Sequence, residues 1–168
     1  MTVVSVDSLR FEFPDGWAVA KYDDWQFCGE FQKLANGIKA ADLIAVSPDG
    51  GTLYLIEAKD FSARLRVKTQ PLMEELVWKT LCTLAALLPA SLNQAGKASE
   101  RQHAGLALRA KKVVVVFHIE PNLTAGLFPG PVYLAQIKMS LLGKFPRIDV
   151  PLHVTCKAAM PALGWSVS

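Results

Sequence analysis

Asp42, Glu57 and Lys59 are the residues of this chain whose types and spacing best suit chemistry. Asp42 opens the apolar run 42–47, and Glu57 and Lys59 close the apolar run 52–59. A Pro-Asp-Gly-Gly sequence joins the two runs, and Asp-Gly between strand-like segments predicts a β-hairpin. Carboxylate oxygens are the ligands that Mg²⁺ prefers, and a nearby lysine can orient a water or stabilise developing charge. The three residues therefore suit metal-assisted hydrolysis of a phosphodiester.

The hairpin turn decides which residues face each other. A two-residue turn and a four-residue loop both pair Ser47 with Thr52, and this register sets Asp42 opposite Glu57. Facing side chains have Cβ atoms roughly 5 Å apart, and strand alternation puts Lys59 on the face of Glu57. A three-residue turn would break the register. Facing carboxylates need a cation or a shared proton, and a divalent metal would be such a cation. The same face carries apolar Ile44, Val46, Leu53 and Leu55.

Asp42, fourteen intervening residues and then Glu57-Ala58-Lys59 resemble the motif of the PD-(D/E)XK, or restriction-endonuclease-like, nuclease superfamily. The resemblance implies that Asp42 and Glu57 bind Mg²⁺ or Mn²⁺ and that Lys59 assists the attacking water. The proline of the family name has no counterpart, because Ala41 precedes Asp42. Solvated charges at the ends of an edge hairpin are the structural alternative.

Further site residues follow from the resemblance. It implies that Glu30, in the first helix, helps to bind the metal and that Gln70 touches the site. A solvated acid and a helix-capping amide are the simpler interpretations of these two residues. Glu75 and Lys79 are spaced i,i+4, which is typical of a surface ion pair; a role for Lys79 at the site is the alternative.

Basic residues follow the motif and are candidates for contacting phosphates. Arg64, Arg66 and Lys68 alternate, so that an extended chain would place them on one side, where they could bind a nucleic-acid backbone. An ordinary solubilising surface is the alternative. A second basic group lies in the segment 93–111 and just after it: Lys97, Arg101, His103, Arg109, Lys111 and Lys112.

The pattern of elements predicts an α/β (α+β) fold, with a central mixed β-sheet flanked by helices. The expected strands are 3–6, 9–13, 17–22, the two hairpin strands, 112–119 and 152–156. The expected helices run from an Asp23 or Asp24 cap to about 35, from 71 to 88 and from 134 to 142. Residues 93–111 are expected to be the loosest part.

The resemblance implies a restriction-endonuclease-like core over about 22–119, within a single nuclease-like domain of residues 1–168. The superfamily core usually has another strand between the first helix and the acid-bearing strand. Residues 36–40 leave no room for it, unless Ile38 starts that strand or an N-terminal strand replaces it.

Composition and the absence of several known motifs argue against several classes of protein. The 51% hydrophobic fraction indicates a well-filled core, and the net charge of +3 is compatible with nucleic acid. Three widely spaced cysteines favour a reducing, cytoplasmic location. Residues 1–13 do not resemble a signal peptide, and the longest apolar stretch, 81–92, is too short to cross a membrane. Phosphate-binding glycine loops, nucleophile elbows and zinc-ligand pairs are absent from the sequence, which argues against an NTPase, a serine hydrolase or a zinc enzyme.

The resulting hypothesis is a Mg²⁺-dependent nuclease, a hydrolase acting on DNA as an endonuclease or deoxyribonuclease. The first alternative is a catalytically inactive domain of the same fold that binds nucleic acid or a protein partner. The second is an unrelated α/β interaction protein whose hairpin charges are incidental. Relatives that cut both strands often form homodimers, and no sequence feature identifies an interface here.

Overall fold

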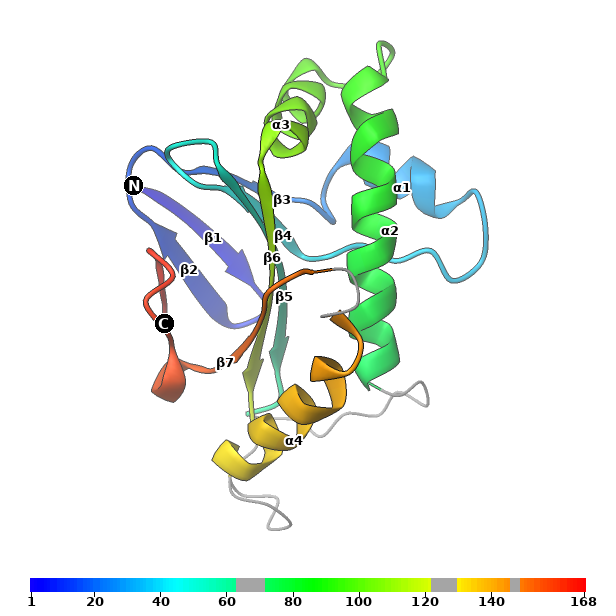
Figure 1. The fold of residues 1–168 in the computed structure, drawn as a ribbon. Coiled ribbons are helices and arrows are strands. Elements are labelled where there is room, and N and C mark those ends of the chain that lie inside the picture. Colours follow the sequence, from blue (N-terminus) through cyan, green and yellow to red (C-terminus); the bar gives the residue numbers. More distant parts are fainter. Residues whose placement is uncertain (63–71, 122–129, 146–148) are drawn as a thin grey trace.

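A five-stranded mixed sheet forms the centre of the fold (Figure 1). The computed structural model describes residues 1–62, 72–121, 130–145 and 149–168. The sheet contains, in order, β3 (Ala18–Lys21), β4 (Leu43–Val46), β5 (Thr52–Asp60), β6 (Lys112–Glu120) and β7 (Leu152–Thr155). The first three strands are antiparallel, and β6 and β7 run parallel to β5. The predicted central mixed sheet is thus confirmed.

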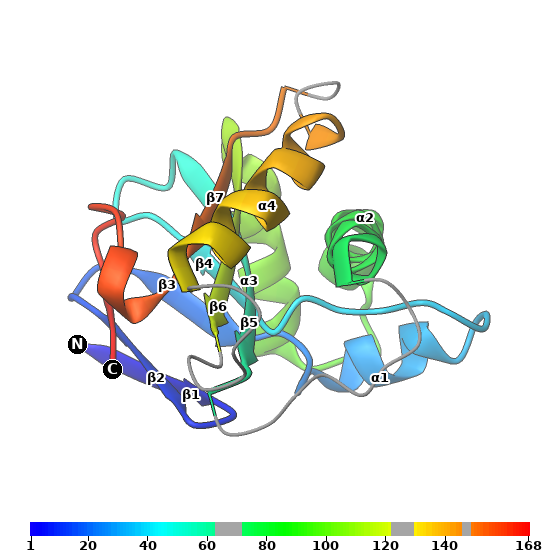
Figure 2. The same ribbon diagram turned by 90° about the horizontal axis from the view of Figure 1, so that it is seen from below.

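A second, smaller sheet covers one face of the central sheet. It consists of β1 (Thr2–Val6), β2 (Leu9–Phe13) and β8 (Ser166–Val167), all antiparallel. Its inward side chains pack with Trp165 against the central strands, where burial of apolar surface holds the two sheets together. Figure 2 shows this sheet on the side opposite to α2. The layer on this face is therefore a β-sheet, and the flanking helices that the sequence predicted lie on the other face.

Helices cover the other face. They are α1 (Gln26–Gln32), α2 (Leu72–Leu92), α3 (Ala98–Arg109) and α4 (Gly130–Leu142). The first part of α2 packs with α4 against β6, and its second part packs with α3 against β4 and β5. A short 3₁₀ helix, Lys157–Ala159, follows β7. The long helix α2 therefore crosses the whole helical face of the sheet.

The hairpin of β4 and β5 has the predicted register. Leu43 pairs with Ile56 and Val46 with Leu53, and the Ser47 amide donates to the Thr52 carbonyl at 2.9 Å. The apolar residues assigned to one face of the hairpin lie together in the core beneath α2 and α3: Ile44, Val46, Leu53 and Leu55.

The first helix differs from the prediction in its start and its length. It is only seven residues long, and no Asp side chain caps it; Trp25 occupies the N-cap position. The Glu100 carboxylate instead accepts hydrogen bonds from the amides of Gln26 and Phe27, at 2.9 and 3.1 Å. The free amides of a helix start attract an acceptor, and here a residue of α3 supplies it from far along the chain.

The prediction that residues 93–111 are the loosest part of the chain is wrong, because most of these residues form α3. Helix α3 was missed because its buried apolar residues are only Ala104 and Ala107, whose small side chains make no strong apolar stripe. The second basic group is therefore carried partly on this helix.

Helix α2 extends beyond the predicted end at 88. It continues through Pro89 to Leu92, and its 21 residues are long and apolar enough to cross a membrane by length and composition alone. The stretch that the sequence predicted to be too short, 81–92, forms only the second part of this helix. Core helices of soluble proteins pass the same test, and 39% of the apolar window is buried inside this structure.

The strand beside the acid-bearing strand β4 comes from before the first helix. β3, which precedes α1, pairs antiparallel with β4, with Lys21 opposite Leu43. No strand occurs within residues 36–40, so the neighbour of β4 on this side precedes α1 in the chain.

We expect Gly164→Ala to lower the free energy of unfolding by about 1–3 kcal/mol, the usual cost of a strained backbone. Gly164 has φ +91, and an added Cβ would lie 2.9 Å from Trp17 Cζ2. Urea unfolding of both proteins measures the difference. Gly29→Ala is the control: nothing lies within 4 Å of that Cβ, and the helical position should gain about 0.5–1 kcal/mol. Equal stability of the two variants would contradict the prediction.

Candidate active site

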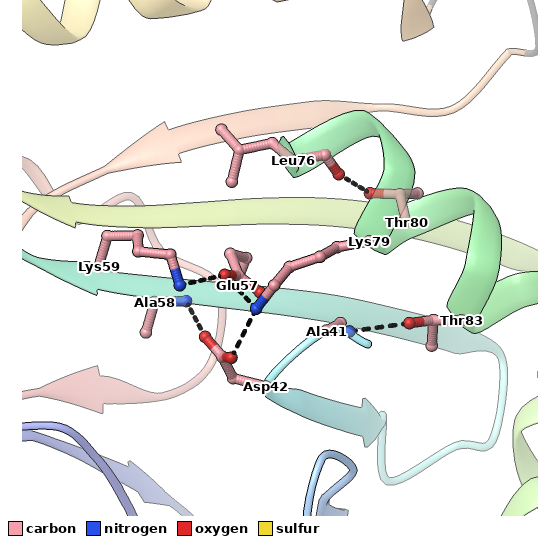
Figure 3. A network of polar contacts seen from close by, with 9 residues as sticks. All are labelled: Ala41, Asp42, Glu57, Ala58, Lys59, Leu76, Lys79, Thr80 and Thr83. Atoms are coloured by element: carbon pink, nitrogen blue, oxygen red, sulfur yellow. Dashed lines mark hydrogen bonds and ion pairs between the residues drawn. The ribbon is translucent and has the colours of Figure 1, made fainter. Parts of the chain in front are cut away.

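Four charged side chains meet where β4 begins, β5 ends and α2 crosses the sheet. Asp42 immediately precedes β4, whereas Glu57 and Lys59 lie on β5. Lys79 extends from α2 toward the sheet and ends between the two carboxylates (Figure 3). The structure therefore brings together the three residues of the predicted motif and adds a second lysine.

The ammonium groups converge on Glu57. Lys59 Nζ lies 2.5 Å and Lys79 Nζ 2.6 Å from Glu57 Oε1, although neither approaches at hydrogen-bonding angles. Lys79 Nζ also lies 3.1 Å from Asp42 Oδ1 and so links the two facing carboxylates. Glu57 Oε2 has no hydrogen-bond partner among the described residues. This oxygen is thus buried without a hydrogen-bond donor from the residues that the structure describes.

Because the site is buried, each charged group in it needs an opposite charge close by. Glu57 is 1% exposed and Asp42 6%. Burial, and then the Asp42 charge, raise the pKa of Glu57 to about 7, while Lys79 and Lys59 act in the opposite direction. Glu57 therefore lies close to the midpoint of its titration near neutral pH, which suits a group that must bind a cation or exchange a proton.

Lys79 is the residue that sequence reasoning underrated. The prediction of a surface ion pair between Glu75 and Lys79 is wrong, because neither residue lies on the surface: Glu75 is 1% exposed and the Lys79 side chain only 14%. Burial lowers the pKa of Lys79, but the charges of Glu57 and Asp42 outweigh it and raise that pKa overall. Lys79 remains a cation and partly neutralises the two acids. The i,i+4 spacing gave no sign of this, because the sheet beneath the helix supplies its partners.

Backbone contacts hold Asp42 in place. The Ala58 amide donates to Asp42 Oδ2 at 2.8 Å, and the Tyr22 amide donates to the Asp42 carbonyl at 2.8 Å. Thr83 of α2 accepts a hydrogen bond from the Ala41 amide at 2.9 Å (Figure 3). Strands β3 and β5 and helix α2 therefore all fix the start of β4, which limits the motion of the Asp42 carboxylate.

The other predicted residues lie outside this cluster or outside the described residues. Glu30 is exposed and pairs with Lys33 at 2.7 Å. The four candidates Arg64, Arg66, Lys68 and Gln70 fall within 63–71, beyond the residues that the structure describes.

One acid near the cluster was expected only as a helix cap. Asp23 follows β3, and burial and the Asp42 charge raise its pKa. The sequence carried no signal for its proximity to Asp42, because that proximity follows from the pairing of β3 with β4.

The donor set fits a hard divalent cation. Asp42 and Glu57 supply oxygen ligands, and Mg²⁺ commonly uses one or two carboxylates together with waters and substrate phosphate. No group of three or more His, Cys, Asp or Glu side chains able to hold a metal occurs among the described residues. Lys79 already links the carboxylates, so a bound metal would have to share or displace its contacts.

Comparison with known proteins finds one distant relative. The chain is 29% identical over 169 aligned residues to a cysteine–tRNA ligase from Neisseria meningitidis serogroup A, an alignment that covers 82% of this chain. It covers only 24% of the ligase, so the chain spans about a quarter of that protein. No protein-family model and no solved structure matches the chain. Function must therefore be argued from the site.

The raised pKa of Glu57 predicts that stability falls as pH rises from about 4.5 to about 7. The folded state binds this proton more tightly than the unfolded chain, so the stabilisation is full below the unfolded pKa and is lost through the folded one. The change should be on the order of 3 kcal/mol. Urea unfolding in a chelating buffer should show this slope, and Glu57→Gln should remove it. Retention of the slope in Glu57→Gln would contradict the assignment, and Glu30→Gln, an exposed carboxyl, should leave it unchanged.

We expect Lys79→Met to destabilise the protein by about 3 kcal/mol at neutral pH, because two buried carboxylates lose the cation that links them. The midpoint of chemical denaturation measures the effect. Lys33→Met is the matched control: it breaks the exposed pair with Glu30 and should cost less than about 1 kcal/mol. Similar effects of the two substitutions would show that Lys79 does not neutralise the site.

Proposed function

We propose that this chain is a metal-dependent nuclease that hydrolyses phosphodiester bonds in DNA. The observation that carries the proposal is the buried convergence of Asp42, Glu57 and Lys59 on one sheet face, in the register that the motif requires. A purely structural salt-bridge network would not need a glutamate oxygen that has no hydrogen-bond partner among the described residues. Asp42 and Glu57 would hold Mg²⁺ or Mn²⁺.

Each residue has a role that its surroundings permit. A metal bound here would polarise the phosphoryl oxygen and acidify a bound water. Lys59 lies beside Glu57 Oε1 with a side chain 17% exposed, so it can reach a water or a phosphate oxygen at the edge of the site. Lys79 keeps the carboxylates converged and can neutralise charge that develops on the phosphate.

The order of elements supports the further proposal that the core is restriction-endonuclease-like. Helix α1 precedes the antiparallel hairpin β4–β5, and α2 then leads to β6, which is parallel to β5. This agrees with the superfamily core implied by the motif. The substitution of β3 for the expected strand changes the connection but leaves the acid-bearing strand between two neighbours.

The opposing candidate is an inactive domain of the same fold that binds nucleic acid or a protein. One observation favours it: Lys79 already supplies a cation to both acids, so the folded site is partly neutralised without metal. Titration with metal separates the two candidates. The cysteine–tRNA ligase relative adds tRNA to the substrates worth testing.

The test is calorimetric titration of Mn²⁺ and Mg²⁺ into the wild type and Asp42→Ala, with cleavage of plasmid DNA, oligonucleotides and tRNA measured on the same samples. We expect metal binding and DNA cleavage in the wild type, and loss of both in Asp42→Ala. Glu30→Ala is the matched control, because it removes an exposed carboxylate that pairs only with Lys33 among the described residues; it should retain both activities.

The remaining outcomes discriminate between the alternatives. Nucleic-acid binding without metal-dependent cleavage would select the inactive module. Cleavage of tRNA but not of DNA would show that the proposed substrate is wrong and that the proposed metal-dependent hydrolysis is right. Absence of metal binding, with and without nucleic acid, would overturn the nuclease proposal.

A further inference from the structure

Helix α2 carries a continuous apolar stripe on the side that faces away from the sheet. Trp78, Leu81, Leu88 and Leu92 are 53, 43, 57 and 65% exposed, and Ala85 is exposed between them. Their spacing of three, four, three and four residues is that of the a and d positions of a coiled-coil heptad repeat. Figure 2, which looks along α2, shows the sheet on one side of the helix and no described element against its outer side.

The surroundings of the stripe are uncharged. No charged residue occurs between Thr80 and Gly96, so the outer face lacks the lysines and glutamates that normally solvate an exposed helix. The helix is consequently apolar on both faces, which is typical of a helix covered on both sides. Large apolar patches on a protein surface usually mark sites of interaction.

We infer that this stripe binds the same stripe of a second copy of the chain, with the two α2 helices antiparallel and crossing at Ala85. The inference does not depend on the proposed function. A heptad stripe is self-complementary, so a second copy supplies the matching surface without any other partner. The small side chain of Ala85 at the centre allows the two helix backbones to approach closely.

Charge favours the antiparallel arrangement over the parallel one. Glu74 is exposed on the same side of α2, one turn before Trp78, and Lys97 is exposed shortly after the helix ends. Antiparallel helices centred on Ala85 bring Glu74 of each copy toward Lys97 of the other. Parallel helices would instead set Glu74 beside Glu74, which is unfavourable. Lys97 also lies 3.5 Å from the buried Glu100 of its own chain, and its own side chain is 58% exposed, which leaves room for a second carboxylate.

The size of the patch suits a reversible dimer. The four large side chains together expose on the order of 400 Å² per copy, within the range of the largest apolar patch on a typical monomer. Two copies with their flanking residues would bury about 1,000 Å² or somewhat more, near the lower limit of specific interfaces. We therefore expect dissociation within the concentration range that ultracentrifugation covers.

Sedimentation equilibrium of the full chain tests the inference. The mass should rise with concentration from 18.3 kDa toward twice that value. Leu81→Lys with Leu88→Lys should raise the dissociation constant by about tenfold or more and leave the circular dichroism spectrum unchanged, because both side chains are exposed. Met139→Lys is the matched control: it adds a lysine at a 70% exposed position of α4 and should not alter the dimer.

Cysteine cross-linking tests the orientation. In a Cys82→Ser background, Leu81→Cys mixed with a mass-tagged Leu88→Cys should form the mixed disulfide in preference to either symmetric one. If the symmetric disulfides form in preference to the mixed one, the antiparallel arrangement is wrong. A monomer at every concentration, or a dimer that survives the paired lysine substitutions, would overturn the interface. If the monomer also binds anionic phospholipid vesicles through these leucines, the stripe is instead a lipid contact.

Discussion

Neutralisation of two facing carboxylates inside the protein is the constraint on which the rest of the site depends. The hairpin register sets Asp42 opposite Glu57, and burial removes the water that would otherwise screen them. Two lysines supply the compensating charge, one from the same strand and one from a helix that crosses the sheet. The arrangement is stable only while α2 remains docked, so the integrity of the site and the packing of that helix are linked.

Helix α2 therefore has two distinct faces. Its inner face contributes Lys79 and Thr83 to the site and leucines and alanines to the core, whereas its outer face carries the apolar stripe. A helix with only the inner role would be expected to have a charged outer surface. The absence of such charges is the reason for inferring a second copy there, and an association through α2 would further stabilise the element that holds the site together.

How far the site could be predicted depends on whether the necessary contacts are local. The hairpin could be predicted because its turn and alternating pattern act over a few residues, and the turn alone decides the register. The position of Lys79 in the site could not be predicted, because Glu75, one turn earlier in the same helix, was the simpler partner to expect. The start of α1 was missed for a similar reason: Glu100, remote in sequence, accepts its first amides. Helix α3 was missed because its fully buried apolar residues are alanines, whose small side chains give a weak periodic signal.

Local sequence was enough to predict the hairpin, the pairing of Asp42 with Glu57, the position of Lys59 on the same face, the long helix after the motif and the apolar strand at 112–119. These follow from turn chemistry and periodicity, which are properties of neighbouring residues. Tertiary structure alone decided that β3 pairs with the acid-bearing strand, that a small β-sheet covers the second face and that Lys79 lies between the acids. Such features depend on which distant surfaces pack together, and that choice is made by the burial of the whole chain.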